Sequence, residues 1–216
     1  MADFSLSLFE HRIEPGAPVS LPAAARVLYV VEGACKVASA DAAAGLSTNT
    51  AWCSATALSL DSAAGAVVLR WELHRGAAQP AGARLVLAAP VSLDPGQTYL
   101  MRGDRVDFPI GGVAYTHTHQ GPGTRRLLHG TIRIDTQGKS HDVAPGEAWF
   151  ESGPDPVFAA ASTTEETAFV RCMVLPLALK GKSSIRYVDP ADADKPKSQR
   201  YQVFIDFPVP TSSAMT

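Results

Sequence analysis

Two histidines spaced two residues apart are the first side chains in this sequence that could do chemistry together. His117 and His119 lie in the stretch GGVAYTHTHQGPGTRRLLHG, with Tyr115 two residues before His117. Alternate residues of a β-strand face the same side, so we expect these three rings to point one way. Two imidazoles on one strand face are a common beginning of a metal site.

The elements that must position these side chains are predicted to be β-strands. Short apolar or alternating runs recur between turns that contain Gly or Pro, and no run has the capped amphipathic pattern of a helix. Residues 113–119 would carry the histidines, 126–134 would return beside them, and 148–151 would follow. Many short strands at regular spacing indicate an all-β sandwich or barrel.

Charge and cysteine content narrow the functional classes. The net charge of −2 gives no electrostatic case for a nucleic-acid or anionic-membrane partner. No apolar run approaches the roughly 20 residues of a membrane helix, and the N-terminus lacks the pattern of a secretory signal. Cys35, Cys53 and Cys172 form no CxxC pair and are expected to be buried in a reducing compartment. We expect a cytoplasmic protein with a small-molecule ligand, and no nucleic acid or membrane.

The sequence contains a weak internal repeat. Residues 28–37, LYVVEGACKV, can be laid over 125–134, RRLLHGTIRI, so that Gly33 matches Gly130. Each half then ends in an apolar strand with an arginine inside it, VVLRWEL and FVRCMVLP. Two similar halves favour two small β-domains in one chain.

The boundary between the halves is expected near residues 75–83. This stretch, RGAAQPAGA, consists mainly of small residues with Gly and Pro and has no periodicity. The expected organisation is an N-terminal domain over 1–80, a C-terminal domain over 81–176 and an arm over 177–216. The arm ends in an alternating run, which we expect to pack on the domains or on a partner subunit.

The second half resembles the cupin family. The first motif of that family is a glycine, five residues, HxH, three or four residues, a glutamate, six residues and a glycine. Gly111, His117, His119 and Gly130 match these spacings, but Gly123 stands where the family has its ligand glutamate.

The second cupin motif is matched only at its start. Gly146 fits, but Val157 falls where the third histidine is expected, so two of the four usual metal ligands are present. The first half is similar to a cupin in outline only, with Arg26 at the glutamate position and no histidine between His11 and His74. The resemblance implies two tandem cupin-type jelly-roll β-barrels, a bicupin. Its first barrel would lack metal ligands and be structural or a dimer surface, and family habit suggests a homodimer.

The resemblance also suggests a third metal ligand. Strands of the family at the position of Glu151 face the barrel interior, so His117, His119 and Glu151 would form a two-histidine, one-carboxylate set. This set suits Fe(II) and tolerates Mn, Ni or Zn. His129 is the other candidate. The competing interpretation is a barrel whose histidines only form hydrogen bonds, with Glu151 solvated or paired with an arginine.

Tyr115 and Arg125 are the candidate catalytic residues. Tyr115 could donate a proton or hydrogen-bond a bound oxygen. Arg125, if its side chain points inward, could anchor a substrate carboxylate or enolate, and Arg126 is the alternative. The competing interpretation is a packed aromatic ring at the barrel mouth and arginines on the outer surface of a strand.

Three functions remain open. By resemblance, the first is a metal-dependent enzyme that acts on a small carbonyl or carboxylate metabolite in the C-terminal barrel, dioxygenase-like or an isomerase or lyase. The second is a degenerate, non-catalytic bicupin that binds a small molecule, and the third is a structural dimer. The HxH pair favours the first, whereas the missing glutamate and third histidine favour the second.

Overall fold

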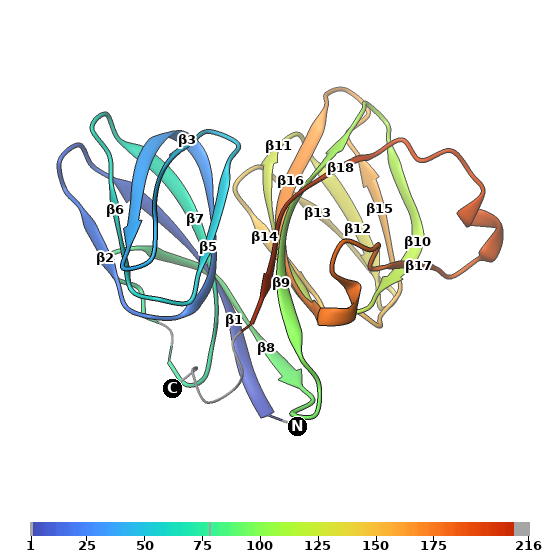
Figure 1. Ribbon diagram of the computed structural model, residues 1–216. Helices are drawn as coiled ribbons and strands as arrows, with labels where there is room; N and C mark the ends of the chain where they lie inside the picture. The colour runs from blue at the N-terminus through green and yellow to red at the C-terminus, as the bar shows by residue number, and fades with distance from the viewer. Residues whose placement is uncertain (1, 78, 210–216) are drawn as a thin grey trace. The chain divides into compact units, whose positions relative to one another are not determined.

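The computed structural model describes residues 2–77 and 79–209 (Figure 1). Its regular elements are β-strands, apart from the short 3-10 helices η1 (Leu177–Leu179) and η2 (Pro190–Ala193). The predicted all-β fold is therefore confirmed. No helix in the described ranges is long and apolar enough to cross a membrane.

The strands predicted over 113–119 and 148–151 are observed with these bounds. In chain order the strands are β1 (Ala2–Ile13), β2 (Val19–Leu21), β3 (Ala25–Ser39), β4 (Ala43–Ser47), β5 (Ala51–Ser54), β6 (Leu58–Asp61), β7 (Ala66–His74), β8 (Arg84–Leu93), β9 (Tyr99–Phe108), β10 (Val113–His119), β11 (Gly123–His129), β12 (Ile132–Thr136), β13 (Lys139–Val143), β14 (Ala148–Glu151), β15 (Val157–Ala161), β16 (Thr167–Pro176), β17 (Ile185–Tyr187) and β18 (Arg200–Pro208).

The chain folds as two compact units. Among the described residues, unit 1 contains those up to Met101 and those from Phe207 to Val209, and unit 2 contains Arg102–Asp206. This division differs from the expected boundary near residue 80, because β8 pairs along β1 and so belongs to unit 1. Within the expected arm over 177–216, β17 and the last strand, β18, are members of the sheets described below for unit 2.

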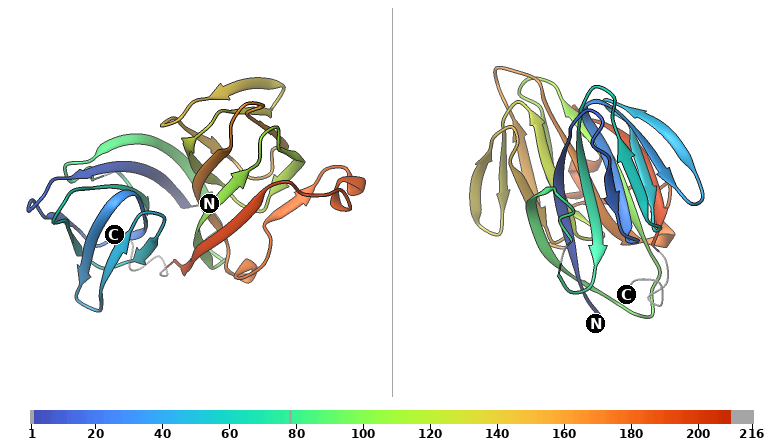
Figure 2. Two further views of the ribbon diagram at one scale, coloured as in Figure 1. Left: turned by 90° about the horizontal axis from the view of Figure 1, so that it is seen from above. Right: turned by 90° about the vertical axis from the view of Figure 1, so that its left-hand side faces the viewer.

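Unit 1 is built on one sheet of eight strands. The neighbours are β2-β6-β3-β7-β1-β8, and β4 and β5 also pair with β3. β3 is 15 residues long, so its first half pairs with β7 and β5 while its second half pairs with β4 and β6. The strands curl (Figure 2) and enclose an apolar core. Its most buried members are Leu28, Val30, Val37, Leu60 and Val68.

Unit 2 contains two five-stranded sheets, ordered β13-β12-β15-β10-β17 and β14-β11-β16-β9-β18. Both sheets curl, but no pairing among the described residues joins one sheet to the other, so each keeps two edge strands. The predicted closed barrels are therefore not observed. Residues from both sheets form one apolar cluster. It includes Val106, Leu127, Ile132, Trp149 and Phe169.

Both units have the same irregularity where the internal repeat matches them. The β3–β7 ladder shifts register just before Gly33, and the β11–β16 ladder does so just before Gly130. The two glycines have φ of 78° and 74°. A Cβ atom at either would lie 2.4 Å from an atom of the segment opposite. Only glycine fits these positions, so the repeated glycine marks the same bend in both units.

Candidate functional site

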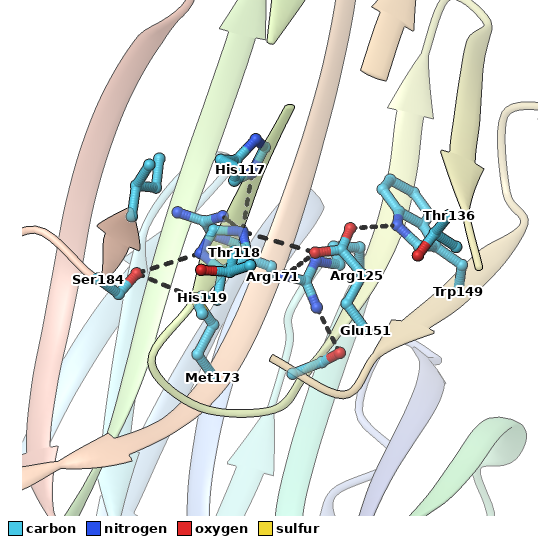
Figure 3. A network of polar contacts seen from close by, with 12 residues as sticks. His117, Thr118, His119, Arg125, Thr136, Trp149, Glu151, Arg171, Met173 and Ser184 are labelled. Carbon is cyan, nitrogen blue, oxygen red and sulfur yellow. Dashed lines mark hydrogen bonds and ion pairs between the residues drawn. The ribbon is translucent and has the colours of Figure 1, made fainter. Parts of the chain in front are cut away.

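The interior of unit 2 changes from apolar to charged along four neighbouring strands of one sheet. Alternate side chains of a strand point inward, and on each of these strands an inward charged residue lies two positions from an inward apolar residue. The pairs are Leu127 and Arg125 on β11, Phe169 and Arg171 on β16, Val106 and Asp104 on β9, and Trp149 and Glu151 on β14. The charged ends meet the histidines of β10 (Figure 3).

The rings of His117 and His119 contact each other. Their Nε2 atoms are 3.2 Å apart and their ring planes lie at 85°. Nδ1 of His117 is 2.7 Å from the backbone carbonyl of Tyr115, so Nδ1 donates and carries the proton. Nδ1 of His119 lies 3.4 Å from the hydroxyl of Ser184. Burial lowers the pKa of both rings, most strongly that of His119, where Arg171 adds to the effect. Both imidazoles are therefore neutral at neutral pH.

Glu151 reaches the same cluster, but an arginine holds it. Its Oε2 is 2.6 Å from Nη2 of Arg125, and its Oε1 accepts a hydrogen bond of 2.9 Å from Nε1 of Trp149. The same Oε2 lies 3.5 Å from Nε2 of His119. Burial lowers the pKa of Arg125 to about 10, so the guanidinium still carries its charge.

A second ion pair completes the cluster. Arg171 donates from Nε and Nη2 to the two carboxylate oxygens of Asp104, at 2.6 and 2.9 Å, and its Nη1 lies 3.5 Å from Nε2 of His119. The nearby carboxylate of Asp104 raises the pKa of Arg171 in spite of its burial. Two guanidinium groups, two carboxylates and two neutral imidazoles therefore leave the cluster without net charge.

This arrangement does not fit a divalent metal ion. The structure brings His117, His119 and Glu151 together, but the Glu151 carboxylate is paired with Arg125, and the Arg171 guanidinium lies beside His119. Because both carboxylates of the cluster are already paired with arginines, a cation here would have no unpaired anionic ligand in a poorly solvated interior. In the described part of the chain, no group of three or more His, Cys, Asp or Glu side chains could hold a metal ion.

The remaining predicted residues lie outside the cluster. Tyr115 contributes its backbone carbonyl, while its ring lies 4.9 Å from Nζ of Lys195. His129 is exposed, and its Nδ1 is 3.1 Å from the backbone carbonyl of Glu166. Arg126 follows Arg125 directly in β11, so its side chain lies on the opposite face of the strand, where it is also buried. Of the candidate catalytic residues, only Arg125 places its side chain among the charged groups.

Three members of the cluster were not predicted from the sequence, namely Asp104, Arg171 and Ser184. Arg171 had a signal, because it is a charge inside the apolar run FVRCMVLP, and a charge in such a run is rarely buried without a partner. Asp104 lies in the mixed run MRGDRVDF, where charge alone does not tell the inner face from the outer one. Ser184 lies in a polar segment without periodicity.

A cavity of about 380 Å³ lies beside the cluster. Asp104, Arg171 and Ser184 belong to both. Arg102 and Asp206 also line the cavity, and Arg102 donates hydrogen bonds of 2.7 Å from Nε and Nη2 to Asp206. The other lining residues are Gly181, Lys182, Ser183, Ile185, Tyr201 and Val203. Three cationic and two acidic side chains thus line the cavity, so its wall carries one excess positive charge.

Solved structures of cupin-fold proteins resemble this fold. A variant of oxalate decarboxylase from Bacillus subtilis matches with a TM-score of 0.67 at 10% identity, over 88% of this chain and 73% of that chain. The 11S allergen from Cocos nucifera matches with 0.60 at 10%, over 82% and 85%. The cupin 2 conserved barrel domain protein from Leptotrichia buccalis matches with 0.50 at 15%, over 81% and 85%. The fold is that of the cupins.

At these identities the likeness concerns the cupin fold alone. No protein-family model matches the sequence, and no curated protein matches it. The resemblance stated from the HxH motif is therefore confirmed for the fold. The activity has to be argued from the residues of the site.

Proposed function

We propose that unit 2 binds a small organic carboxylate in the cavity beside the buried cluster, and that the chain is a bicupin with one cupin-type domain in each unit. The observation that carries the binding proposal is the excess positive charge of the cavity wall. Because the neighbouring cluster is already neutral, an added anion is attracted to the cavity, whereas an added cation is not.

The lining offers both kinds of contact that such a ligand needs. Arg171 and Lys182 supply positive charge, and Ser184 supplies a hydroxyl group. Tyr201 and Val203 supply apolar surface for the carbon part of the molecule. Sites of this composition orient a ligand through a few polar groups and gain affinity from the apolar wall. One structural neighbour is, by its name, a decarboxylase of oxalate, a small carboxylate.

The proposal is tested by isothermal titration calorimetry of the whole protein with benzoate, pyruvate and oxalate. Benzamide, the uncharged analogue of benzoate, is the control ligand. We expect at least one carboxylate to bind and benzamide not to bind. Lys182→Gln should weaken that binding about tenfold, the effect of one charged contact worth about 1.4 kcal/mol.

The matched control is Lys139→Gln, which changes an exposed lysine of β13 that does not line this cavity. It should bind like the unchanged protein. If none of the three carboxylates binds, or if both variants lose affinity equally, the proposal fails.

One observation favours a second candidate, metal-dependent chemistry on a carbonyl or carboxylate compound, dioxygenase-like or of the isomerase or lyase kind. The backbone carbonyl of Tyr115 fixes the proton of His117 on Nδ1, which leaves Nε2 of His117 with a lone pair, 3.2 Å from Nε2 of His119. Metal-binding histidines are commonly held in this way.

Elemental analysis separates the two candidates. Protein purified without a metal-binding tag is compared with the His117→Ala/His119→Ala double variant. Near-stoichiometric Fe, Mn, Ni or Zn that disappears in the double variant would replace the carboxylate proposal with the metal-dependent one. We expect no stoichiometric metal in either protein.

A further inference from the structure

Unit 1 contains a second buried charged cluster, in the half of the chain that the sequence indicated to be structural. Arg26 on β3 and Arg70 and Glu72 on β7 have exposed fractions of 0%, 0% and 3%. His11 on β1 is equally buried, at 2%. All four belong to strands that neighbour one another in the order β3-β7-β1.

The carboxylate of Glu72 forms ion pairs with both Arg26 and Arg70. Oε1 of Glu72 lies 3.0 Å from Nε of Arg26 and 3.0 Å from Nη1 of Arg70. Nη2 of Arg70 donates to the backbone carbonyls of Gln79 and Pro80, at 2.8 and 2.9 Å. These carbonyls are neutral acceptors, so they leave the charge of the second arginine uncompensated.

The cluster therefore carries one excess positive charge. His11 adds none at neutral pH, because burial, Arg70 and Arg26 lower its pKa to about 4. Within the described residues, Nη1 of Arg26, Nε of Arg70 and Nε2 of His11 have no hydrogen-bond partner. Buried polar groups are almost always satisfied, so the two unpaired arginine donors beside an unbalanced charge indicate a missing acceptor.

Comparison with the cluster of unit 2 identifies the group that the unit 1 cluster lacks. There Arg125 pairs with Glu151 and Arg171 pairs with Asp104, so each arginine has a carboxylate of its own. Arg70 and Arg171 occupy the same place in the internal repeat, each inside the last apolar strand of its half. Unit 1 has two buried arginines but lacks the second carboxylate.

We propose that unit 1 binds a small monovalent anion, of the size of formate, acetate or chloride, against Arg26 and Arg70. The anion takes the place of the missing carboxylate and accepts hydrogen bonds from Arg26 Nη1 and Arg70 Nε. One negative charge balances the cluster, whereas a dianion would overcompensate it. This site lies wholly in unit 1 and does not rest on the function proposed for unit 2.

The test is thermal unfolding of the whole chain at constant ionic strength, with a bulky sulfonate replaced stepwise by formate, acetate or chloride. A ligand of the folded state raises the midpoint temperature with its concentration. We expect a saturable rise with at least one anion. A rise with formate or acetate identifies a carboxylate as the ligand, and a rise with chloride alone identifies an inorganic ion.

Three variants assign the effect to the cluster. Arg26→Met removes the excess charge and should abolish the rise. Glu72→Gln keeps both arginines and increases the excess positive charge of the cluster. It should therefore lower the apparent dissociation constant of the anion at least tenfold. This variant also tests the proposal if Arg26→Met fails to fold. Lys139→Gln changes an exposed lysine of β13 in unit 2 and should respond like the unchanged protein. No rise with any of the three anions, or an unchanged constant in Glu72→Gln, would overturn the proposal.

Discussion

Arg125 compensates the charge of the buried Glu151 carboxylate in the unit 2 cluster. Its guanidinium is completely buried and lies 2.6 Å from the Glu151 carboxylate. We expect Arg125→Met to lower the free energy of unfolding by about 3–5 kcal/mol, because it leaves a buried carboxylate without its charged partner. Urea unfolding followed by circular dichroism measures this loss.

The control for this prediction is the double variant Arg125→Met/Glu151→Gln. It removes both charges, so most of the lost stability should return, and the two substitutions should be strongly non-additive. A double variant that is less stable than Arg125→Met alone would show that the two side chains do not act as a pair.

Single residues of the site could be predicted only where their spacing has a known meaning. Their spacing indicates His117 and His119, and the cupin resemblance adds Glu151; the three side chains do lie together. Arg171 and Arg70 were noted as arginines inside apolar strands, but their partners could not be predicted. An ion pair between strands depends on which strands are neighbours, and no local pattern contains that information.

At the scale of the strands, the contact between β11 and β16 explains why Gly123 replaces the family's glutamate. A Cβ atom at Gly123 would lie 2.7 Å from the backbone oxygen of Cys172 and 2.9 Å from Cγ of Met173. These contacts are too short for any side chain. The close approach of β11 and β16 therefore leaves no room for a glutamate side chain at position 123.

We expect Gly123→Ala to lower the free energy of unfolding by about 1–3 kcal/mol, the usual effect of overpacking. Gly123→Glu should cost at least as much and should not create a metal site. Thermal unfolding and elemental analysis measure the two effects. The matched control is Gly45→Ala, since a Cβ atom there meets nothing within 4 Å. A stable Gly123→Glu protein with stoichiometric metal would contradict this account.

Strand positions could be predicted better than strand pairing. The strands over 113–119 and 148–151 were located from local alternation, which depends on a few consecutive residues. The pairing of β8 with β1 joins segments about 80 residues apart, and no feature of either segment predicts its partner. For the same reason, the sequence predicts a domain boundary at the loop near residue 80, whereas the observed boundary lies after β8, which pairs with β1.

At the scale of the molecule, β8 distinguishes the expected domain limit from the observed one. Ala89, Val91 and Leu93 of β8 are buried in unit 1. A fragment over 81–216 contains β8 but not β1. We expect its amides over 84–93 to exchange with solvent as fast as those of an unstructured chain, whereas the whole protein protects them.

Hydrogen exchange followed by mass spectrometry of peptides from both proteins makes this comparison. Equal protection of β8 in the fragment and in the whole chain would show that β8 does not need β1. The homodimer and the cytoplasmic location expected from the sequence stay predictions at this scale.

The place of β18 in the sheet β14-β11-β16-β9-β18 has a consequence for how the protein is made. β18 is the last strand described, yet Tyr201 lines the cavity and Asp206 holds Arg102. During synthesis, the ribosome must therefore pass residue 206 before the cavity wall is complete. Domains generally fold as units when their last strand is available. A nascent chain that stalls earlier would expose the edge of β9 and would lack part of the wall of the proposed ligand site in unit 2.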